Sequence, residues 1–285
     1  MISTAAKPGQ PAGDTGRALP RITLVTPSYE QATFLDATIQ SVVDQAYPSL
    51  EYFVYDGGST DGSVEVIRAR ANVIDFWQSQ PDGGQSAAIS SGWARASGEI
   101  LAWLNSDDQL TPGALGRVGQ LFLDHPETDL IYGRMDLVDP GGRVLGTIGE
   151  PFRRRTMLLS RNVIPQPAAF VRRNALGRVG PLDESLHYVM DLDLWLRLAA
   201  DRRPLYVPET FARAIVHGAT KTLGGRDAMS AERQRVRLRH AKGPERLMIR
   251  LQPVASLIYH RLPPGARRAI DGARPRRARA DRING

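Results

Sequence analysis

Short apolar segments alternate with amphipathic ones over the first 125 residues of this chain, and this alternation limits the fold more than any other feature. The apolar segments are rich in β-branched and aromatic residues and predict buried strands, at residues 22–27, 51–55 and 99–104. Apolar side chains at helical spacing predict helices at residues 34–45, 61–71, 85–96 and 112–122. This order predicts an α/β fold in which a mostly parallel, Rossmann-like central sheet has helices on both faces.

The second half of the sequence predicts a different arrangement. A hairpin is expected where two extended segments flank Pro140-Gly141-Gly142. The other expected elements are strands at residues 168–172 and 204–216 and a helix at residues 191–200. Trp103 and Trp195 lie among apolar neighbours, so we expect both to pack in the core.

The composition excludes several kinds of site. The chain has no cysteine, which rules out a disulfide framework, a cysteine-ligated zinc site and a thiol nucleophile. No window reaches the ~18–20 apolar residues that a membrane-spanning helix needs. Residues 1–20 are rich in Pro, Gly and small side chains and lack the apolar core of a secretion signal. We therefore expect a disordered leader and a cytoplasmic protein.

The positive charge is concentrated at one end of the chain. Residues 226–285 contain 16 Lys and Arg against 5 Asp and Glu, although the whole chain has a net charge of +7. The part before this tail is therefore mildly acidic, and no recognised nucleic-acid-binding motif accompanies the charge, which argues against a nucleic-acid partner. Basic residues interleaved with Leu, Ile and Tyr predict either helices on an anionic membrane, at the inner face of the plasma membrane, or a solvated helical cap with a disordered end.

Polar and acidic residues follow three of the predicted strands, at Ser28-Tyr29, residues 56–62 and residues 105–108. In an open α/β sheet, ligands bind at the carboxyl ends of the strands. Neither GxxxxGK[ST] nor GxGxxG occurs, so the usual glycine-rich phosphate loops are absent from the sequence. Carboxylates that face a diphosphate make sense if a divalent cation, Mg²⁺ or Mn²⁺, lies between them.

Five strings in this sequence carry a resemblance to a known family: PSYEQATFL, YDGGSTDGS, PDGGQSAAISSGWARASGE, LAWLNSDDQLTPGAL and MDLDLWLRLA. Together and in this order, the chain resembles the family 2 glycosyltransferases, which have the GT-A fold. The resemblance implies a glycosyltransferase domain over residues 21–225, with a nucleotide-binding half at 21–110 and an acceptor half at 111–225. The leader (1–20) and the basic tail (226–285) lie outside it.

The resemblance implies that five residues bind the nucleotide sugar. Asp56 matches the carboxylate that hydrogen-bonds the base, and Ser28 and Tyr29 lie where the first strand meets it. Asp82 and Gln85 match the segment that closes over the nucleotide and the donor sugar. Each has a structural alternative, since Asp and Ser also stabilise turns and helix starts. In the same loop as Asp56, we expect Asp61 to cap the following helix.

Asn105-Ser106-Asp107 occupies the position of the family's DxD motif. By resemblance, Asp107 is the ligand of the divalent cation, and Asn105 and Ser106 contact the donor. Asn105 departs from the pattern, where Asp is more usual, so it keeps an acceptor for a ribose hydroxyl but loses a charge. The resemblance also implies that His217 reaches the metal or the diphosphate, and that Gln166-Pro167 borders the acceptor pocket.

Asp191 matches the last acid of the family's Glu-Asp motif, the general base, although Met190 replaces the preceding Glu. Asp191 and Asp193 are two apart on a predicted helix and cannot face the same way. If Asp191 points into the cleft, Asp193 points aside and is expected to stabilise the first helical turn.

The resemblance therefore implies an inverting glycosyltransferase in which Asp191 takes the acceptor proton. The expected donor is a nucleoside-diphosphate sugar, UDP-linked first, and the expected acceptor is a saccharide or a lipid-linked molecule of cell-surface polysaccharide or glycolipid synthesis. Two alternatives stay open. A nucleotidyltransferase would usually show a basic Gly-rich loop after the first strand. A nucleotide-sugar-binding protein with a decayed site is favoured by Asn105 and Met190, while Asp56, Asp107 and Asp191 argue against it.

Overall fold

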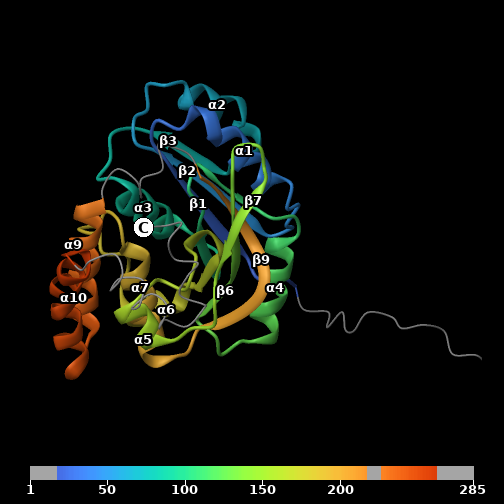
Figure 1. Cartoon of the computed structure of the whole chain (residues 1–285). Helices are drawn as coiled ribbons and strands as arrows, with labels where there is room; N and C mark the ends of the chain where they lie inside the picture. The colour runs from blue at the N-terminus through green and yellow to red at the C-terminus, as the bar shows by residue number, and fades with distance from the viewer. Residues whose placement is uncertain (1–17, 217–225, 262–285) are drawn as a thin grey trace, which may run out of the picture.

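The computed structural model describes residues 18–216 and 226–261 (Figure 1). The strands are β1 Ile22–Ser28, β2 Leu50–Asp56, β3 Phe76–Ser79, β4 Ile100–Trp103, β5 Asp108–Leu110, β6 Leu130–Val138, β7 Val144–Ile148, β8 Ala169–Arg172 and β9 Leu205–Ile215. The α-helices are α1 Ala32–Val43, α2 Ser63–Ala69, α3 Gln85–Arg95, α4 Ala114–Asp124, α5 Arg154–Leu159, α6 Arg173–Val179, α7 Met190–Asp201, α9 Arg226–His240 and α10 Pro244–Arg261. Every strand and helix predicted above is present.

The strands form one sheet in the order β3-β2-β1-β4-β8-β6-β9-β5, with β7 added to β6. The four strands from β3 to β4 are parallel, as the alternation of strand and helix predicts. Beyond β4 the sheet is mixed, because β8, β7 and β5 run antiparallel to their neighbours and β6 pairs with β9 in parallel. The parallel part of the sheet therefore lies within residues 22–103.

Two apolar cores lie on the two faces of the sheet. Successive residues of β4 alternate between them: Leu101 and Trp103 belong to the core under α3 and α7, whereas Ile100 and Ala102 belong to the core under α1, α2 and α4. Figure 1 shows these helices on opposite sides of the sheet. This alternation follows from strand geometry, since successive side chains point to opposite faces. The prediction of helices on both faces is confirmed.

Three tryptophans pack beneath the carboxyl end of β4. Trp103 stacks on Trp195 with ring centroids 5.7 Å apart, and Trp93 meets Trp103 edge-on at 5.4 Å. Trp103 and Trp195 are almost fully buried, which confirms that both are core residues. The loop that begins at Asn105 therefore starts two residues after a rigidly packed side chain.

One helix start differs from the prediction. We expected Pro112 in the first turn of a helix, but α4 begins at Ala114. Gly113 precedes it with φ of 77°, a left-handed conformation that glycine adopts without steric cost. Pro112 therefore belongs to the turn before the helix.

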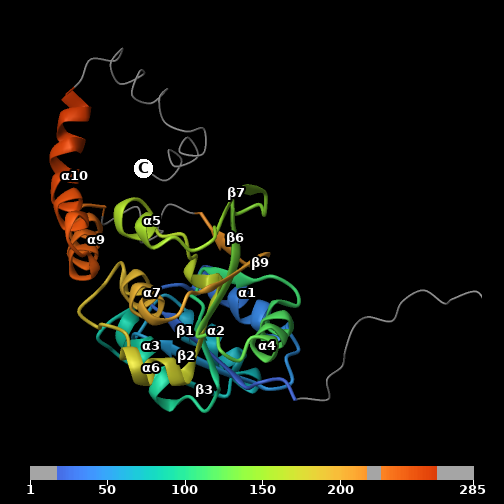
Figure 2. The ribbon, with the colours of Figure 1, turned by 90° about the horizontal axis from the view of Figure 1, so that it is seen from below.

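Both helices of the tail pack against the rest of the fold. Val236 of α9 and Ile249 of α10 are fully buried, and Figure 2 shows α9 beside α7 and α10 extending beyond α5. Arg237, itself buried, donates hydrogen bonds to the carbonyl oxygens of Met157 and Ser160, at 3.2 and 2.6 Å. Among the described residues, no helix has both the length and the apolar character needed to cross a membrane.

Candidate active site

The loops that follow β1 and β2 are joined at the carboxyl end of the parallel sheet. Ser28 pairs with Asp56 at the end of the two strands. Beyond them, the backbone amide of Glu30 donates to the Ser59 hydroxyl at 2.8 Å, and the Glu30 carboxylate accepts from the backbone of Thr60 at 2.8 Å. These bonds hold two candidate donor-binding segments in fixed register.

Asp61 caps two helices at once. Its carboxylate accepts from the backbone amide of Ser63, the first residue of α2, at 3.0 Å, and from that of Ala32, the first residue of α1, at 2.9 Å. Both amides are among those that a helix leaves unpaired at its start. The prediction that Asp61 is a capping residue is confirmed.

Asp56 is buried, and its carboxylate is held by groups of its own loop and of β3. It accepts from the backbone amides of Gly58 and Ser59 and from the hydroxyls of Ser59 and Ser79, at 2.6–3.1 Å. The structural alternative, a turn-stabilising Asp, is therefore present. Hydrogen bonding to a nucleotide base stays a prediction for this residue.

Two of the other candidates for donor binding, Tyr29 and Asp82, lie beside Gly57. A Cβ atom on this glycine would lie 3.2 Å from the Tyr29 ring and 3.5 Å from Oδ1 of Asp82. Tyr29 is 64% exposed, so an aromatic face lies open beside the Asp82 carboxylate. The hydroxyl of Ser28 is buried and has no hydrogen-bond partner among the described residues, which is costly for a polar group. A ligand hydroxyl or carbonyl at this place would satisfy it.

Asn105 lies at the centre of a polar network, which we call the Asn105 network. Its Oδ1 accepts from Gln85 at 2.6 Å, and its Nδ2 donates to Asp108 and to Gln166, both at 3.1 Å. Gln166 in turn donates to the backbone oxygen of Trp103 at 2.6 Å. Both donor and acceptor atoms of Asn105 are used, so an amide rather than a carboxylate fits this position.

The Asn105 network predicts that aspartate at position 105, which the resemblance gives as the more usual residue, would destabilise this protein. In Asn105→Asp, the donor toward Asp108 and Gln166 is lost and a further charge lies beside two acids, so we expect a loss of about 1–3 kcal/mol in the free energy of unfolding at pH 8. Burial beside two acids would raise the pKa of the aspartate introduced at position 105. The loss of unfolding free energy should therefore be largest above that pKa and shrink as the pH falls to 5. Thermal unfolding at both pH values measures it, with exposed Asn174→Asp as the control. Equal stability at pH 8 contradicts the assigned role.

Two adjacent acids, Asp107 and Asp108, follow Asn105 and Ser106 in the loop after β4. Asp107 is half-buried and Asp108 is buried. Burial, together with the neighbouring charge of Asp107, raises the pKa of Asp108 well above its usual range. A nearby cation would relieve this unfavourable charge. Among the residues that the structure describes, no group of three or more His, Asp or Glu could hold a metal alone. The role of Asp107 as a ligand of a divalent cation therefore stays a prediction.

Ser106 lies between these residues with a buried side chain. Its backbone oxygen accepts from the Thr38 hydroxyl of α1 at 2.9 Å, which ties the loop to the helix below it. Contact between the Ser106 side chain and the donor stays a prediction. His217 lies outside the described residues, and its predicted role stays a prediction as well.

Asp191 is half-buried at the start of α7. Its carboxylate accepts from Asn162 at 2.8 Å and from the backbone amide of Leu192 at 2.7 Å. Burial raises the pKa of Asp191 to about 6, although the Leu192 amide, the charge of Arg233 and Asn162 each favour the charged form. A carboxylate with a pKa near neutrality is suited to proton transfer.

One loop connects Asp191 to the Asn105 network. Asn162, which binds Asp191, and Gln166, which binds Asn105, are four residues apart. Even a fully extended chain would separate their Cα atoms by no more than about 14 Å. One short loop therefore connects the Asp191 carboxylate to the acidic loop after β4. That Gln166-Pro167 borders the acceptor pocket stays a prediction.

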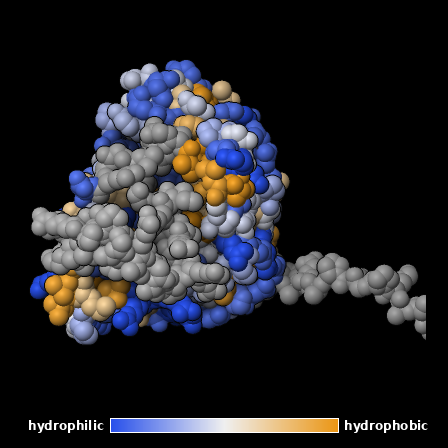
Figure 3. Space-filling view, viewed as in Figure 1, coloured by the Kyte–Doolittle hydropathy of each residue, from blue (hydrophilic) through white to orange (hydrophobic). Residues whose placement is uncertain are grey.

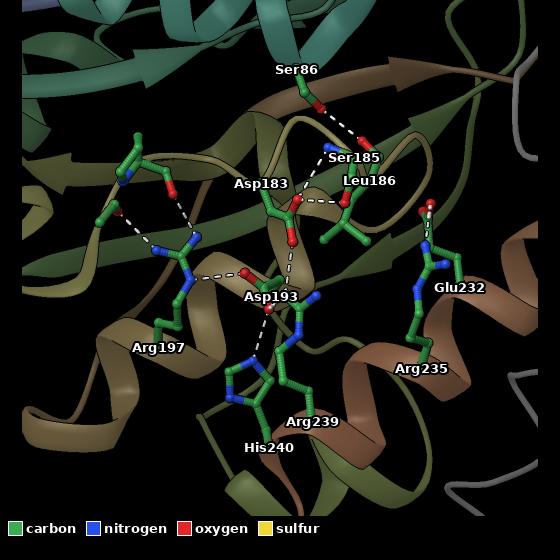
Figure 4. Close-up of polar contacts among 12 residues, drawn as sticks. Ser86, Asp183, Ser185, Leu186, Asp193, Arg197, Glu232, Arg235, Arg239 and His240 are labelled. Carbon is green, nitrogen blue, oxygen red and sulfur yellow. Dashed lines mark hydrogen bonds and ion pairs between the residues drawn. The ribbon is translucent and has the colours of Figure 1, made fainter.

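Asp193 points away from Asp191, as predicted, and is fully buried. It forms what we call the Asp193 cluster (Figure 4), with Arg197 at 2.8 Å, Arg239 at 3.1 Å and His240 at 2.9 Å. Burial raises the pKa of Asp193, but hydrogen bonds from His240 and Arg197 outweigh it, and the pKa falls to about 2. Asp193 thus does more than stabilise the first turn of α7, because it joins α7 to the end of α9.

Sequence reasoning missed three residues around Asp191: Asn162, Glu232 and Arg233. The last two lie on α9, which was treated as part of the tail. A signal was present, since Met229, Glu232, Val236 and His240 recur at helical spacing and mark one inward face. Nothing in the sequence around Asn162 points to its role.

Comparisons with known proteins agree with this geometry. Residues 23–184, more than half of the chain, match the family described as Glycosyl transferase family 2. An uncharacterized glycosyltransferase of Mycobacterium tuberculosis is 31% identical over 191 residues, which are 66% of this chain and 72% of that protein. A PGL/p-HBAD biosynthesis glycosyltransferase of Mycobacterium bovis is 28% identical over 184 residues, 63% of this chain and 70% of that protein.

The fold is also shared with solved structures. The mannosyltransferase PcManGT from Pyrobaculum calidifontis, in complex with GDP-Man and Mn²⁺, aligns with a TM-score of 0.62 and 18% identity. The alignment covers 96% of this chain and 81% of that one. At this identity the likeness shows the fold, which is GT-A. Together with the family match and the similar enzymes, it establishes that the chain belongs to the family 2 glycosyltransferases.

Proposed function

We propose that this protein is an inverting glycosyltransferase that moves a sugar from a nucleoside-diphosphate sugar to an acceptor hydroxyl. The observation that supports it most is the loop from Asn162 to Gln166, which links a carboxylate of raised pKa to the acidic loop at the sheet edge. Asp56, Tyr29 and Asp82 would bind the nucleotide at the same edge.

The reaction needs one displacement and no protein nucleophile. The acceptor oxygen attacks the anomeric carbon while the bond from that carbon to the diphosphate oxygen breaks on the opposite face. The acceptor proton passes to a carboxylate oxygen of Asp191 as the new C–O bond forms. Asn162 holds that carboxylate through one oxygen, and the Leu192 amide holds the other, so its orientation is fixed before the acceptor binds.

Asp107 would hold the divalent cation, with Asp108 beside it. When bound, the cation supplies Lewis-acid stabilisation of the charge that develops on the diphosphate. The Asn105 network keeps the loop in place and positions Gln85 and Gln166 on either side of it. The occupied amide of Asn105 weakens one argument for a decayed site, because the replacement of Asp by Asn has a structural reason.

A donor panel tests the proposal. Purified protein is incubated with UDP-, GDP- and dTDP-sugars, with and without Mn²⁺ or Mg²⁺, and released nucleoside diphosphate is measured. We expect metal-dependent release from one donor, with UDP-sugars first among the candidates, even with water as the acceptor. No release and no donor binding by calorimetry across the panel would favour a nucleotide-sugar-binding protein with a decayed site. The family assignment argues against a nucleotidyltransferase.

The rate should depend on pH through Asp191. The base must be ionised, and burial raises its pKa to about 6. We therefore expect kcat/KM for the acceptor to be level above pH 7 and to fall about tenfold per unit below pH 6, because kcat/KM reports groups before the acceptor binds. Measuring kcat/KM from pH 4.5 to 8 checks this, with circular dichroism at each pH as the control for unfolding. A flat profile down to pH 5 contradicts the assignment of Asp191 as the base.

The outer face of α10 supports a further part of the proposal, contact with an anionic membrane that carries a lipid-linked acceptor. Leu247, Met248 and Leu251 are 60%, 44% and 52% exposed. Beside them, Arg246 and Arg250 are exposed and four residues apart, which places them in a row along the same helix, and Lys242 is exposed just before the helix begins. Figure 3 shows apolar surface over α10 and also over β7. An apolar stripe beside a basic one is typical of helices that lie on anionic membranes.

Replacing the apolar stripe should release the protein from lipid. Leu247→Glu with Leu251→Glu removes two side chains whose burial is worth about 1.5–3 kcal/mol each, so we expect binding to weaken by on the order of 10²-fold or more. Co-sedimentation with phosphatidylglycerol vesicles measures this, with phosphatidylcholine vesicles showing the part due to charge. The control is Val73→Glu, which places the same charge at a partly exposed apolar site outside α10. Unchanged sedimentation of the double variant contradicts this surface.

A further inference from the structure

Glu232 of α9 reaches the chain segment just before Asp191. It is 6% exposed, and its carboxylate accepts hydrogen bonds from the backbone amides of His187, Tyr188 and Val189, at 2.9, 2.6 and 3.0 Å. These three successive peptides precede α7, whose second residue is Asp191. A single buried carboxylate therefore fixes three consecutive peptide planes at the entrance to the helix that carries the base.

A carboxylate is the side-chain group best suited to this place. Both of its oxygens only accept, and together they offer about four acceptor positions, whereas an amide would turn a donor toward one of the three backbone N–H groups. Hydrogen bonds to an ionised acceptor are roughly twice as strong as neutral ones. Val189 is buried, so without Glu232 its amide would be left unpaired away from water.

Residues at the end of α9 bind the chain segment that follows Asp191. Arg239 and His240 bind Asp193, two residues after the base, at 3.1 and 2.9 Å. Arg239 also binds Asp183 at 2.8 Å, which ties the start of the same segment to the helix. α9 therefore contacts the chain before and after Asp191 through charged hydrogen bonds.

From the opposite side, the segment contacts the donor-binding half. The Ser86 hydroxyl, at the start of α3, donates to the backbone oxygen of Leu186 at 2.8 Å. Leu186 is adjacent to the first peptide that Glu232 binds. The neighbour of Ser86, Gln85, belongs to the Asn105 network. The segment is thus held between α9 and the donor side, and its position sets the distance from Asp191 to the donor.

We propose that Glu232 is a positioning residue for Asp191, so that the basic C-terminal segment completes the active site of this enzyme. The inference rests on the proposed function. The family match ends at residue 184, before both Asp191 and α9. Asp56, Asp82 and Asp107 lie on other elements, so donor binding should not depend on Glu232. A shift of about 1 Å in a catalytic group costs on the order of 10²-fold in rate.

The test is Glu232→Gln, which keeps size and removes the charge and one acceptor. We expect kcat for sugar transfer to fall about 10- to 100-fold, with the donor KM and the donor affinity by calorimetry within about twofold of wild type. Hydrogen exchange should speed up at the amides of residues 187–189 and stay unchanged in β1 and β2. The matched control is Glu245→Gln, which removes another tail carboxylate that binds Arg154 and a backbone amide, away from Asp191.

A double variant separates positioning from general stabilisation. If Glu232 acts through Asp191, adding Glu232→Gln to Asp191→Asn should lower kcat by no more than about twofold further. Full additivity, a normal kcat in Glu232→Gln, or a loss of donor affinity in that variant would each overturn the inference. A wild-type protein that turns over no donor would instead contradict the proposed function itself, so the two failures are distinguishable.

Discussion

Asp191→Asn should lower kcat for sugar transfer by about 10²–10⁴-fold, which is the usual worth of a general base. The change removes the basic oxygen but keeps the shape of the side chain beside Asn162 and the Leu192 amide. Initial rates at saturating donor and acceptor measure it, and calorimetry with the donor should show an unchanged affinity. Asp201→Asn, at the other end of α7, is the matched control.

The unfolding temperature of the Asp191→Asn variant should show whether low activity comes from the loss of the base or from a damaged fold. The pKa of Asp191 in the folded protein, about 6, is above its unfolded value, so its charged form is disfavoured in the folded state. The folded state therefore loses stability as the pH rises from about 4 through 6, and Asn avoids this loss. At pH 7 the Asp191→Asn variant should unfold at the same temperature as wild type or higher. Low activity with a lowered unfolding temperature would count against a catalytic role.

The parallel half of the fold could be predicted because its signals are local. β1, β2 and β4 are nearly continuous apolar runs, since a parallel strand is buried on both faces. β5 could not be found in this way. It has three residues, Asp108–Leu110, and is a strand because β9, about 100 residues later, pairs with it. Such a pairing depends on tertiary structure rather than on propensity.

Some features of the candidate site could also be predicted from the sequence, and others could not. Motif resemblance named the residues at the strand ends, and the structure brings Asp82 and Tyr29 to the same glycine. The motif resemblance could not explain Asn105, because two partners that make an amide suitable there are 20 and 61 residues away in the sequence. From sequence alone, Asn105 counted as a lost charge. In the structure it is an occupied donor and acceptor.

The tail shows why net charge is a weak guide to structure. Arg237 and Arg239 contributed to the basic excess from which we predicted membrane helices or a solvated cap. Arg237 is buried against α5, and Arg239 binds Asp183 and Asp193. In the part of the tail that the structure describes, residues 226–261, exposed basic side chains lie beside exposed apolar ones on α10. The membrane prediction therefore moves from the whole tail to one face of one helix.

Asp107→Ala should abolish most of the metal-dependent turnover of the donor. If Asp107 is the protein ligand of the cation, its loss removes Lewis-acid stabilisation worth several kcal/mol, and about 3–4 kcal/mol corresponds to 10²–10³-fold in kcat/KM. The remaining acid is poorly suited to replace it, because burial raises the pKa of Asp108 and its carboxylate is already bonded to Asn105.

The measurement is nucleoside diphosphate release over a titration with Mn²⁺. In the Asp107→Ala variant we expect the half-saturating Mn²⁺ concentration to rise at least tenfold and the maximal rate to fall. Asp107→Glu should recover part of both, because it restores a carboxylate at a displaced position. Asp124→Ala, an exposed acid at the end of α4, controls for the loss of one negative charge. Wild-type Mn²⁺ dependence in Asp107→Ala would show that the cation is held elsewhere, and the acids at the sheet edge would then need another role.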